Sequence, residues 1–271
     1  MTTLRFILPL LLLALTACSK STQPVVESYP LPSVPASVTE PGERASIVCA
    51  HFWDDAQFPY PPTDSISPEL EQAMANFASI AALASSRDSV AIGAAEMVRK
   101  GGSDYVMPLA ERYLYYRGSP MRNEEIFLLF LQAAPDWERT PLMLPEVMQN
   151  RMGTEAPDFE FIDAKGKTGS LSRFVAERGE TLVYFFDSEC ATCKERIPYA
   201  DEAADGRAII AVCPQNYAGS FKEAAAMFPK HWIVVRDRGT IETDELYLLP
   251  TLPSAYIIGS DMTVLAKDLL L

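Results

Sequence analysis

The sequence predicts a small all-α domain followed by an α/β domain. Three observations lead to this prediction. Apolar residues recur at helical spacing from about Ala45 to Met152, the composition changes at Gly153, and short β-type runs then alternate with helical segments. Such alternation is typical of a sheet covered by helices. The length of 271 residues accommodates both domains, which we place at residues 45–152 and 153–271.

The N-terminus has the layout of a secretory signal, which we assign to residues 1–17. Arg5 precedes an apolar run from Phe6 to Leu15, and this run is too short to span a bilayer. Leu15-Thr16-Ala17-Cys18 resembles a bacterial lipobox, in which the cysteine thiol is lipidated and becomes the mature N-terminus. The alternative is an ordinary signal peptide with a chance cysteine. The lipobox implies a protein held on a membrane by lipid on Cys18.

The lipobox implies that the protein is localised in the cell envelope and faces the periplasm. Ser19, in place of Asp, resembles lipoproteins sorted to the outer membrane of Gram-negative bacteria. Residues 18–44 are rich in Pro, Ser, Thr and Val and predict a semi-extended tether. A net charge of -13 argues against nucleic acid or an anionic membrane surface as a partner.

Four helical segments are predicted within residues 45–152. One begins at Pro68, with Ser67 as its N-cap, and a second ends at Gly101-Gly102. The segments cover residues 68–81, 89–100, 105–116 and 123–134. They predict an all-helical domain.

The α/β domain is predicted from strands and helices in alternation. The strands are expected at residues 181–186, 208–213, 232–236 and 254–258, with helices after Cys190 and around 220–227.

Cys190-Ala191-Thr192-Cys193 follows directly after the strand at 181–186. We expect a helix to start at or just after Cys190. The unpaired N–H groups at a helix start stabilise a thiolate, so this position would favour the charged form of the first cysteine. The first cysteine then attacks a disulfide, and the second displaces the mixed intermediate. Cys190 and Cys193 are therefore the predicted catalytic pair.

Further motifs make the C-terminal region resemble the thioredoxin superfamily, in particular its TlpA/ResA-like periplasmic thiol-disulfide reductases. Gly153-Thr154-Glu155-Ala156-Pro157-Asp158-Phe159 resembles the opening of that family, and Pro198 matches its kinking proline. Leu252-Pro253-Ser254 resembles its cis-proline loop. The resemblance implies a central mixed sheet flanked by helices, no cofactor, and protein thiols or disulfides as partners. Leu252 and Pro253 are the implied substrate-binding residues.

The chain departs from this family at several positions. Glu189 stands where thioredoxins usually have Trp, and the position of their buried acid falls on Tyr184. A carboxylate beside the thiol disfavours the thiolate, so we expect a reducing protein and not a strong oxidant. The chain also stops at Leu271, which leaves little room for the last helix of the fold. We therefore expect helices of residues 45–152, or a second copy, to cover part of the sheet.

The N-terminal region has a resemblance of its own. His51-Phe52-Trp53-Asp54 and the run from Tyr113 to Glu125 resemble a helical domain of unknown function that precedes thioredoxin modules in some bacterial lipoproteins. It implies no known chemistry.

The Cys-x-x-Cys motif has two other interpretations, a zinc site and a non-catalytic scaffold. A zinc site needs more ligands than one Cys-x-x-Cys, and His51 and His231 have no partner spacing, so we expect no metal. The second interpretation is a partner- or ligand-binding lipoprotein that keeps the fold as a non-catalytic scaffold.

The two other cysteines are expected to be structural, because Cys49 and Cys213 lie in apolar surroundings. No feature identifies the redox partner or the oligomeric state.

Overall fold

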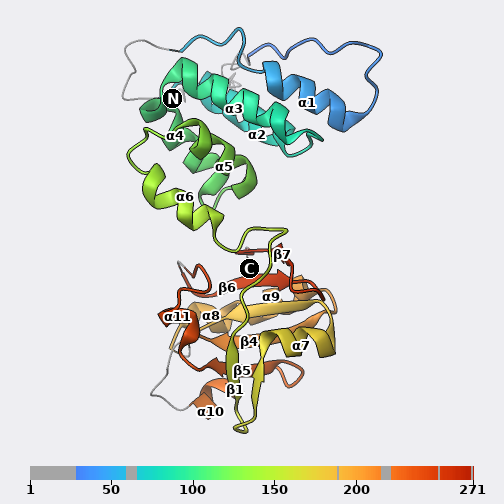
Figure 1. Ribbon diagram of the computed structural model, residues 1–271, viewed down its shortest axis with the longest axis vertical. Helices are drawn as coiled ribbons and strands as arrows, with labels where there is room; N and C mark the ends of the chain where they lie inside the picture. The colour runs from blue at the N-terminus through green and yellow to red at the C-terminus, as the bar shows by residue number, and fades with distance from the viewer. Residues whose placement is uncertain (1–28, 59–65, 188, 215–220, 250, 270) are drawn as a thin grey trace, which may run out of the picture.

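The computed structural model describes residues 29–58, 66–187, 189–214, 221–249, 251–269 and 271. The predicted signal peptide, Cys18 and Ser19 lie outside the described residues. Figure 1 shows a helical part and a sheet-containing part, one above the other. No helix within the described residues is long and apolar enough to cross a membrane.

The helical part contains the helices predicted at 68–81, 89–100 and 123–134 to within two residues, and two further helices, at 41–51 and 140–148, that were not predicted. Its helices are α1 (Pro41–His51), α2 (Pro68–Ala81), α3 (Arg87–Gly101), α4 (Ser103–Ala110), η1 (Glu111–Tyr115), α5 (Glu124–Ala133) and α6 (Thr140–Met148). Because α1 begins at Pro41, residues 41–44 of the predicted tether are helical.

Local sequence explains the helix starts. Ser67, Ser86 and Asn123 each accept a hydrogen bond from a backbone N–H in the first turn of α2, α3 and α5. The predicted helix at 105–116 is divided instead. Pro108 lies inside α4, where it lacks an N–H for the helix ladder, and the chain continues as the wider π-helix η1.

Aromatic side chains fill the core of the helical part. Trp53 and Phe77 are fully buried, with ring centroids 5.6 Å apart. Gly93 permits the close crossing of α1 and α3, because a Cβ at this position would lie 2.3 Å from the Cys49 carbonyl oxygen. This core includes no residue of the sheet.

The C-terminal part is a seven-stranded mixed sheet. Its strands are β1 (Glu160–Asp163), β2 (Thr168–Ser170), β3 (Thr181–Phe185), β4 (Ala208–Cys213), β5 (Ile233–Asp237), β6 (Ser254–Ile258) and β7 (Val264–Ala266), in the order β2-β1-β5-β4-β3-β6-β7. The pairs β3–β4 and β4–β5 are parallel, and the others are antiparallel. Strands β4 and β6 have the predicted bounds. The predicted fold class, an α/β domain after a small all-α domain, is confirmed.

Helices cover both faces of this sheet. On one face α7 (Leu171–Arg178) and α11 (Thr240–Thr243) pack against Val183 and Phe185. On the other, α8 (Ala191–Glu195), α9 (Ile197–Ala204) and α10 (Phe221–Ala225) accompany Tyr184 and its neighbours. Every residue of β3 is buried as a result. This burial explains the continuous apolar run that predicted the strand.

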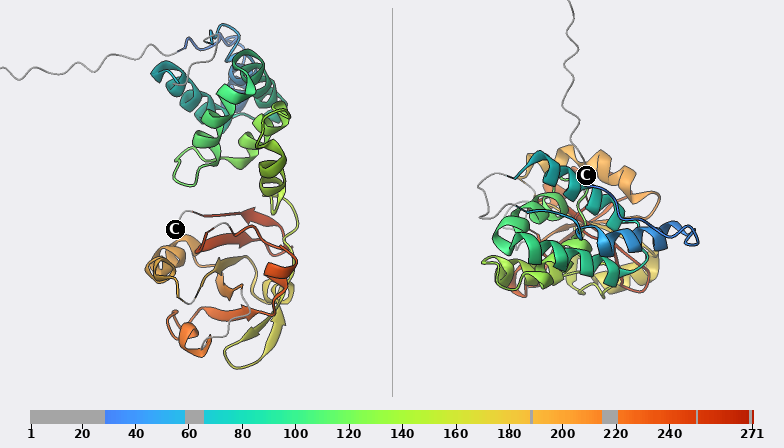
Figure 2. Two further views of the ribbon diagram at one scale, coloured as in Figure 1. Left: turned by 90° about the vertical axis from the view of Figure 1, so that its left-hand side faces the viewer. Right: turned by 90° about the horizontal axis from the view of Figure 1, so that it is seen from above.

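The two parts meet at the β7 edge of the sheet (Figure 2). The backbone N–H of Gly153 donates to the Val264 carbonyl at 2.8 Å, and that of Val264 donates to the Thr154 carbonyl at 2.9 Å. No helix follows β7 in the described residues. The helical part therefore contacts the sheet at its β7 edge, while helices of the C-terminal part cover the two faces. Cover by a second copy stays a prediction. The apolar cores stay separate, and hydrogen bonds and ion pairs connect the two parts.

Candidate active site

The predicted catalytic motif lies at the end of β3, at the start of a helix. Cys190 is the N-cap of α8, and its sulfur accepts a hydrogen bond from the Cys193 backbone N–H at 3.1 Å. A donor in this position favours a negatively charged sulfur. Helix α8 ends at Glu195, Arg196 separates it from α9, and Pro198 is the second residue of α9, so the predicted kink is a break between two helices.

The two cysteines differ in exposure. Cys190 is half-buried, whereas Cys193 is only 2% exposed. Burial raises the pKa of the Cys193 thiol to about 12, and its hydrogen bond with Cys190 adds to the rise. Cys190 is therefore the sulfur that a partner protein can reach, and Cys193 can reach only a sulfur already held at Cys190.

The second predicted site segment lies beside the motif. The Leu252–Pro253 peptide bond is cis, and the Cys190 thiol donates to the Leu252 carbonyl at 3.7 Å. Because β6 pairs with β3, with Ser254 opposite Phe185, the loop before β6 lies next to the loop after β3. Leu252 and Pro253 thus lie together with Cys190, although the sequence separates them by some sixty residues.

Tyr184 occupies the place expected for a buried acid. It is fully buried, and its hydroxyl donates to the Cys193 carbonyl at 2.6 Å. Burial raises the pKa of this phenol above its usual range, so it stays protonated and acts as a donor. Tyr184 therefore positions the start of α8.

The acids near the motif shape the loop. The Asp187 carboxylate accepts the Glu189 backbone N–H at 2.7 Å, and the Asp187 carbonyl accepts the Cys190 N–H at 3.2 Å. A backbone hydrogen bond from Asp187 partly offsets the rise in the pKa of Cys193. Asp187 thus organises the turn that presents Cys190.

A buried ionic cluster adjoins the cis-proline loop. Asp268 is 5% exposed, and its carboxylate accepts hydrogen bonds from Arg117, from Arg122 at 2.7 Å, and from the Ser254 hydroxyl at 3.2 Å. Ser254 directly follows Pro253. The cluster therefore connects the helical part to the cis-proline loop. Sequence reasoning missed it, because single charges so far apart in the chain carry no pairing signal.

A cavity of about 820 Å³ opens beside the same loop, between the two parts of the chain. Its lining includes Leu252 and Pro214, the residue that follows β4, together with α6 and the region around α11. Because the Leu252 carbonyl also contacts the Cys190 sulfur, this cavity adjoins the Cys-x-x-Cys motif.

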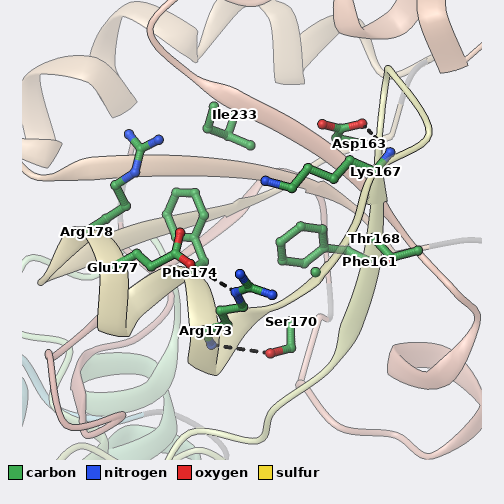
Figure 3. A pocket seen from close by; sticks show the side chains of 11 residues that line it. Phe161, Asp163, Lys167, Thr168, Ser170, Arg173, Phe174, Glu177, Arg178 and Ile233 are labelled. Carbon is green, nitrogen blue, oxygen red and sulfur yellow. Dashed lines mark hydrogen bonds and ion pairs between the residues drawn. The ribbon is translucent and has the colours of Figure 1, made fainter.

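A second cavity lies between the β1–β2 hairpin and α7 (Figure 3). Lys167, Arg173 and Arg178 surround Phe161 and Phe174 there. Its volume of about 130 Å³ is well below the roughly 300 Å³ at which ligand pockets begin. We assign it no function.

The remaining candidate residues lie outside the site. Cys49 is fully buried in the helical core, where burial raises the pKa of its thiol to about 12. Cys213 is buried at the end of β4. His51 pairs with Asp54, and His231 pairs with Asp201. Within the described ranges, no group of three His, Cys, Asp or Glu side chains could hold a metal ion.

A central strand that ends in Cys-x-x-Cys, beside a cis-proline loop, defines the class of thioredoxin-like proteins. The chain also belongs to the family described as "Domain of unknown function (DUF5106)", whose model matches residues 14–152, ahead of the thioredoxin-like part. The match covers the helical part, so the resemblance to a helical domain of unknown function is confirmed.

Two solved structures are similar to this chain. A thioredoxin-like protein from Bacteroides caccae is 26% identical, with 90% of this chain and 95% of that chain covered and a TM-score of 0.72. The thioredoxin domain of a thiol-disulfide oxidoreductase from Bacteroides vulgatus is 25% identical, with 44% and 89% covered and a TM-score of 0.39. No curated protein matches the chain. The first comparison covers both parts, which confirms the resemblance to thioredoxins.

Proposed function

We propose that this protein is a thiol-disulfide oxidoreductase that works through Cys190 and Cys193. One observation carries the proposal: the accessible Cys190 sulfur is 3.1 Å from the Cys193 N–H and 3.7 Å from the Leu252 carbonyl. The sulfur thus has a donor that favours its thiolate, and beside it lies an extended loop with backbone groups for a substrate strand. A scaffold has no need of this arrangement.

The exchange proceeds in two balanced steps. The Cys190 thiolate attacks one sulfur of a substrate disulfide, forms a mixed disulfide and expels the other substrate sulfur as a thiolate. Cys193 then gives its proton to water or to the first released substrate thiolate, attacks the Cys190 sulfur and releases the second substrate thiolate. Two electrons pass to the substrate, and the protein is left with a Cys190–Cys193 disulfide. A dithiol partner must reduce it before the next cycle.

Trapping of mixed disulfides tests the proposal. In Cys193→Ser the first step remains and the second is lost, so covalent complexes with partner proteins accumulate on non-reducing gels. Cys190→Ser is the matched control and accumulates none. Complexes trapped by Cys190→Ser instead would reverse the two roles. If neither variant traps a partner and the chain does not cycle with dithiothreitol, the protein is a scaffold.

Net reduction is the proposed direction. The support is the sequence pattern, in which the exposed carboxylate of Glu189 directly precedes Cys190. We expect a reduction potential toward about -270 mV, the thioredoxin end of the scale. Equilibration with a dithiothreitol redox buffer measures it, and a value near about -120 mV would contradict a reducing role.

We also propose that lipid on Cys18 anchors the protein to the envelope, on its periplasmic side, in the outer membrane. The support is the lipobox pattern and Ser19. Several acyl chains on one residue anchor a protein stably, whereas one chain does so only marginally. Cys18→Ala should move the protein from the outer-membrane fraction to the soluble fraction. A variant that stays in the membrane would refute the lipid anchor.

A further inference from the structure

The cavity beside the cis-proline loop is lined by residues from both parts of the chain. We call it the interdomain groove, and it has a volume of about 820 Å³. Its described lining residues are Pro145, Glu146, Gln149, Pro214, Ile241, Glu242, Asp244, Glu245, Tyr247, Leu248, Leu249 and Leu252. The volume lies within the range of sites that enclose ligands. A substrate segment that reaches Cys190 across Leu252 therefore has this groove within reach.

Hydrogen bonds hold the two walls together. The Asn150 side chain donates to the Leu246 carbonyl at 2.9 Å and accepts the Leu248 N–H at 3.0 Å. The Gln149 side chain donates to the Glu245 carbonyl. Asn150 is buried, so this contact is shielded from water. The helical part thus supplies a defined wall, and α6 is the element that forms it.

The groove combines an apolar floor with an acidic rim. Tyr247 is buried, and Leu248, Leu249 and Leu252 are half-buried along the floor. The rim carries four exposed carboxylates, those of Glu146, Glu242, Asp244 and Glu245. No Lys or Arg is among the described lining residues. The groove therefore favours a partner with apolar and positively charged side chains.

We propose that the interdomain groove binds an extended peptide segment of the substrate protein, with Lys or Arg flanking the reducible cysteine. The inference rests on the proposed function, because it places that cysteine at Cys190. An extended segment advances about 3.3–3.6 Å per residue, so residues next to the cysteine fall within the groove. Complementary charges accelerate encounter and select partners. The helical part, which the DUF5106 family model matches, then has a specific role, because it forms one wall of the substrate site.

Two peptide disulfides test the proposal. Each is a disulfide-linked dimer of a synthetic peptide with one central cysteine, flanked by Lys in the first and by Glu in the second. Each reduced full chain reduces one peptide disulfide and is itself oxidised, and the second-order rate constant of this single reaction should be about tenfold higher for the Lys peptide at low salt. At about 1 M salt the Debye length falls to about 3 Å, so the preference should nearly vanish.

The variants separate the groove from the redox chemistry. Glu242→Lys/Asp244→Lys should abolish or invert the preference, whereas Glu138→Lys/Glu202→Lys, which changes two exposed carboxylates outside the groove, should retain it. Reduction of each oxidised variant by the neutral reagent dithiothreitol should be unchanged, and failure of that reaction would count against the proposed function instead. Equal rate constants for the two peptides would assign the groove to an apolar partner or a second copy and overturn the proposal. A preference that survives the charge reversal would also overturn it.

Discussion

The two cysteines show how burial divides the work between identical side chains. Cys190 is within reach of a partner, whereas burial raises the pKa of Cys193 to about 12. At neutral pH very little of Cys193 is thiolate, and only the thiolate attacks a disulfide. The second step should therefore limit the exchange.

Resolution by Cys193 should accelerate with pH. At any pH below the pKa of Cys193, its thiolate fraction increases about tenfold for each unit by which the pH rises. Between roughly pH 6 and pH 9, the rate of resolution should therefore increase in the same proportion. The measurement uses chain with thionitrobenzoate on Cys190 and records the absorbance of the released thiolate. Cys193→Ser is the control and should release almost none. A rate that levels off near neutral pH would contradict the expectation.

Tyr184→Phe should separate positioning from stability. The variant removes the hydrogen bond to the Cys193 carbonyl in a buried site, so we expect a loss of about 1–3 kcal/mol in the free energy of unfolding. Tyr247→Phe is the matched control, because its hydroxyl donates to the Pro157 carbonyl at 2.6 Å, away from the motif. Both variants should lose stability in urea, but only Tyr184→Phe should slow thionitrobenzoate release. Equal release rates would remove the positioning role.

At the scale of elements, the sheet and the helical part meet through charged groups that come from distant segments. Arg117 and Arg122 lie between η1 and α5, and Asp268 follows β7. Lys267, only 6% exposed, pairs with Glu124 at 2.6 Å. Partly desolvated charges of this kind must all find partners, so the pairing defines how these elements fit together.

Asp268→Asn should destabilise the protein strongly. It leaves Arg117 and Arg122 without their shared carboxylate, and removal of one partner of a buried pair costs about 3 kcal/mol or more. Urea unfolding measures the loss. The control Glu177→Gln breaks the exposed pair with Arg173 and should shift the midpoint little. Similar midpoints for the two variants would show that the cluster contributes no more than a surface pair.

For the whole molecule, the contacts between the helical part and the sheet predict that the stability of each part depends on the other. The segment after α6 pairs along β7, and the isolated fragment 153–271 would lose the partners of Asp268 and Lys267. We expect this fragment to unfold at lower urea concentration or without a cooperative transition. Circular dichroism of the fragment and of the full chain measures this. A monomeric fragment as stable as the full chain would show that the domains are independent.

Predictions from sequence succeed where neighbouring residues carry the signal. The bounds of β4 and β6 follow from short apolar runs, and the start of α2 follows from Ser67 and Pro68. The π-helix at Glu111–Tyr115 was not predicted, because it depends on how the chain continues beyond Pro108. The expected cover of the sheet by the helical part takes the form of contacts along the β7 edge, and the sequence does not indicate which edge is covered, because the partners of Val264 and Lys267 lie more than a hundred residues away.

The sequence by itself determined the order of the elements, the thioredoxin-like class and the pairing of Cys190 with Cys193, since each depends on residues close together in the chain. Tertiary structure alone decided the burial that separates the two thiols, the place of Tyr184 under α8, and the union of Asp268 with Arg117 and Arg122. It also decided that α6 forms a wall beside Leu252. The physical reason is that desolvation and charge pairing depend on distance in space, which local sequence patterns do not encode.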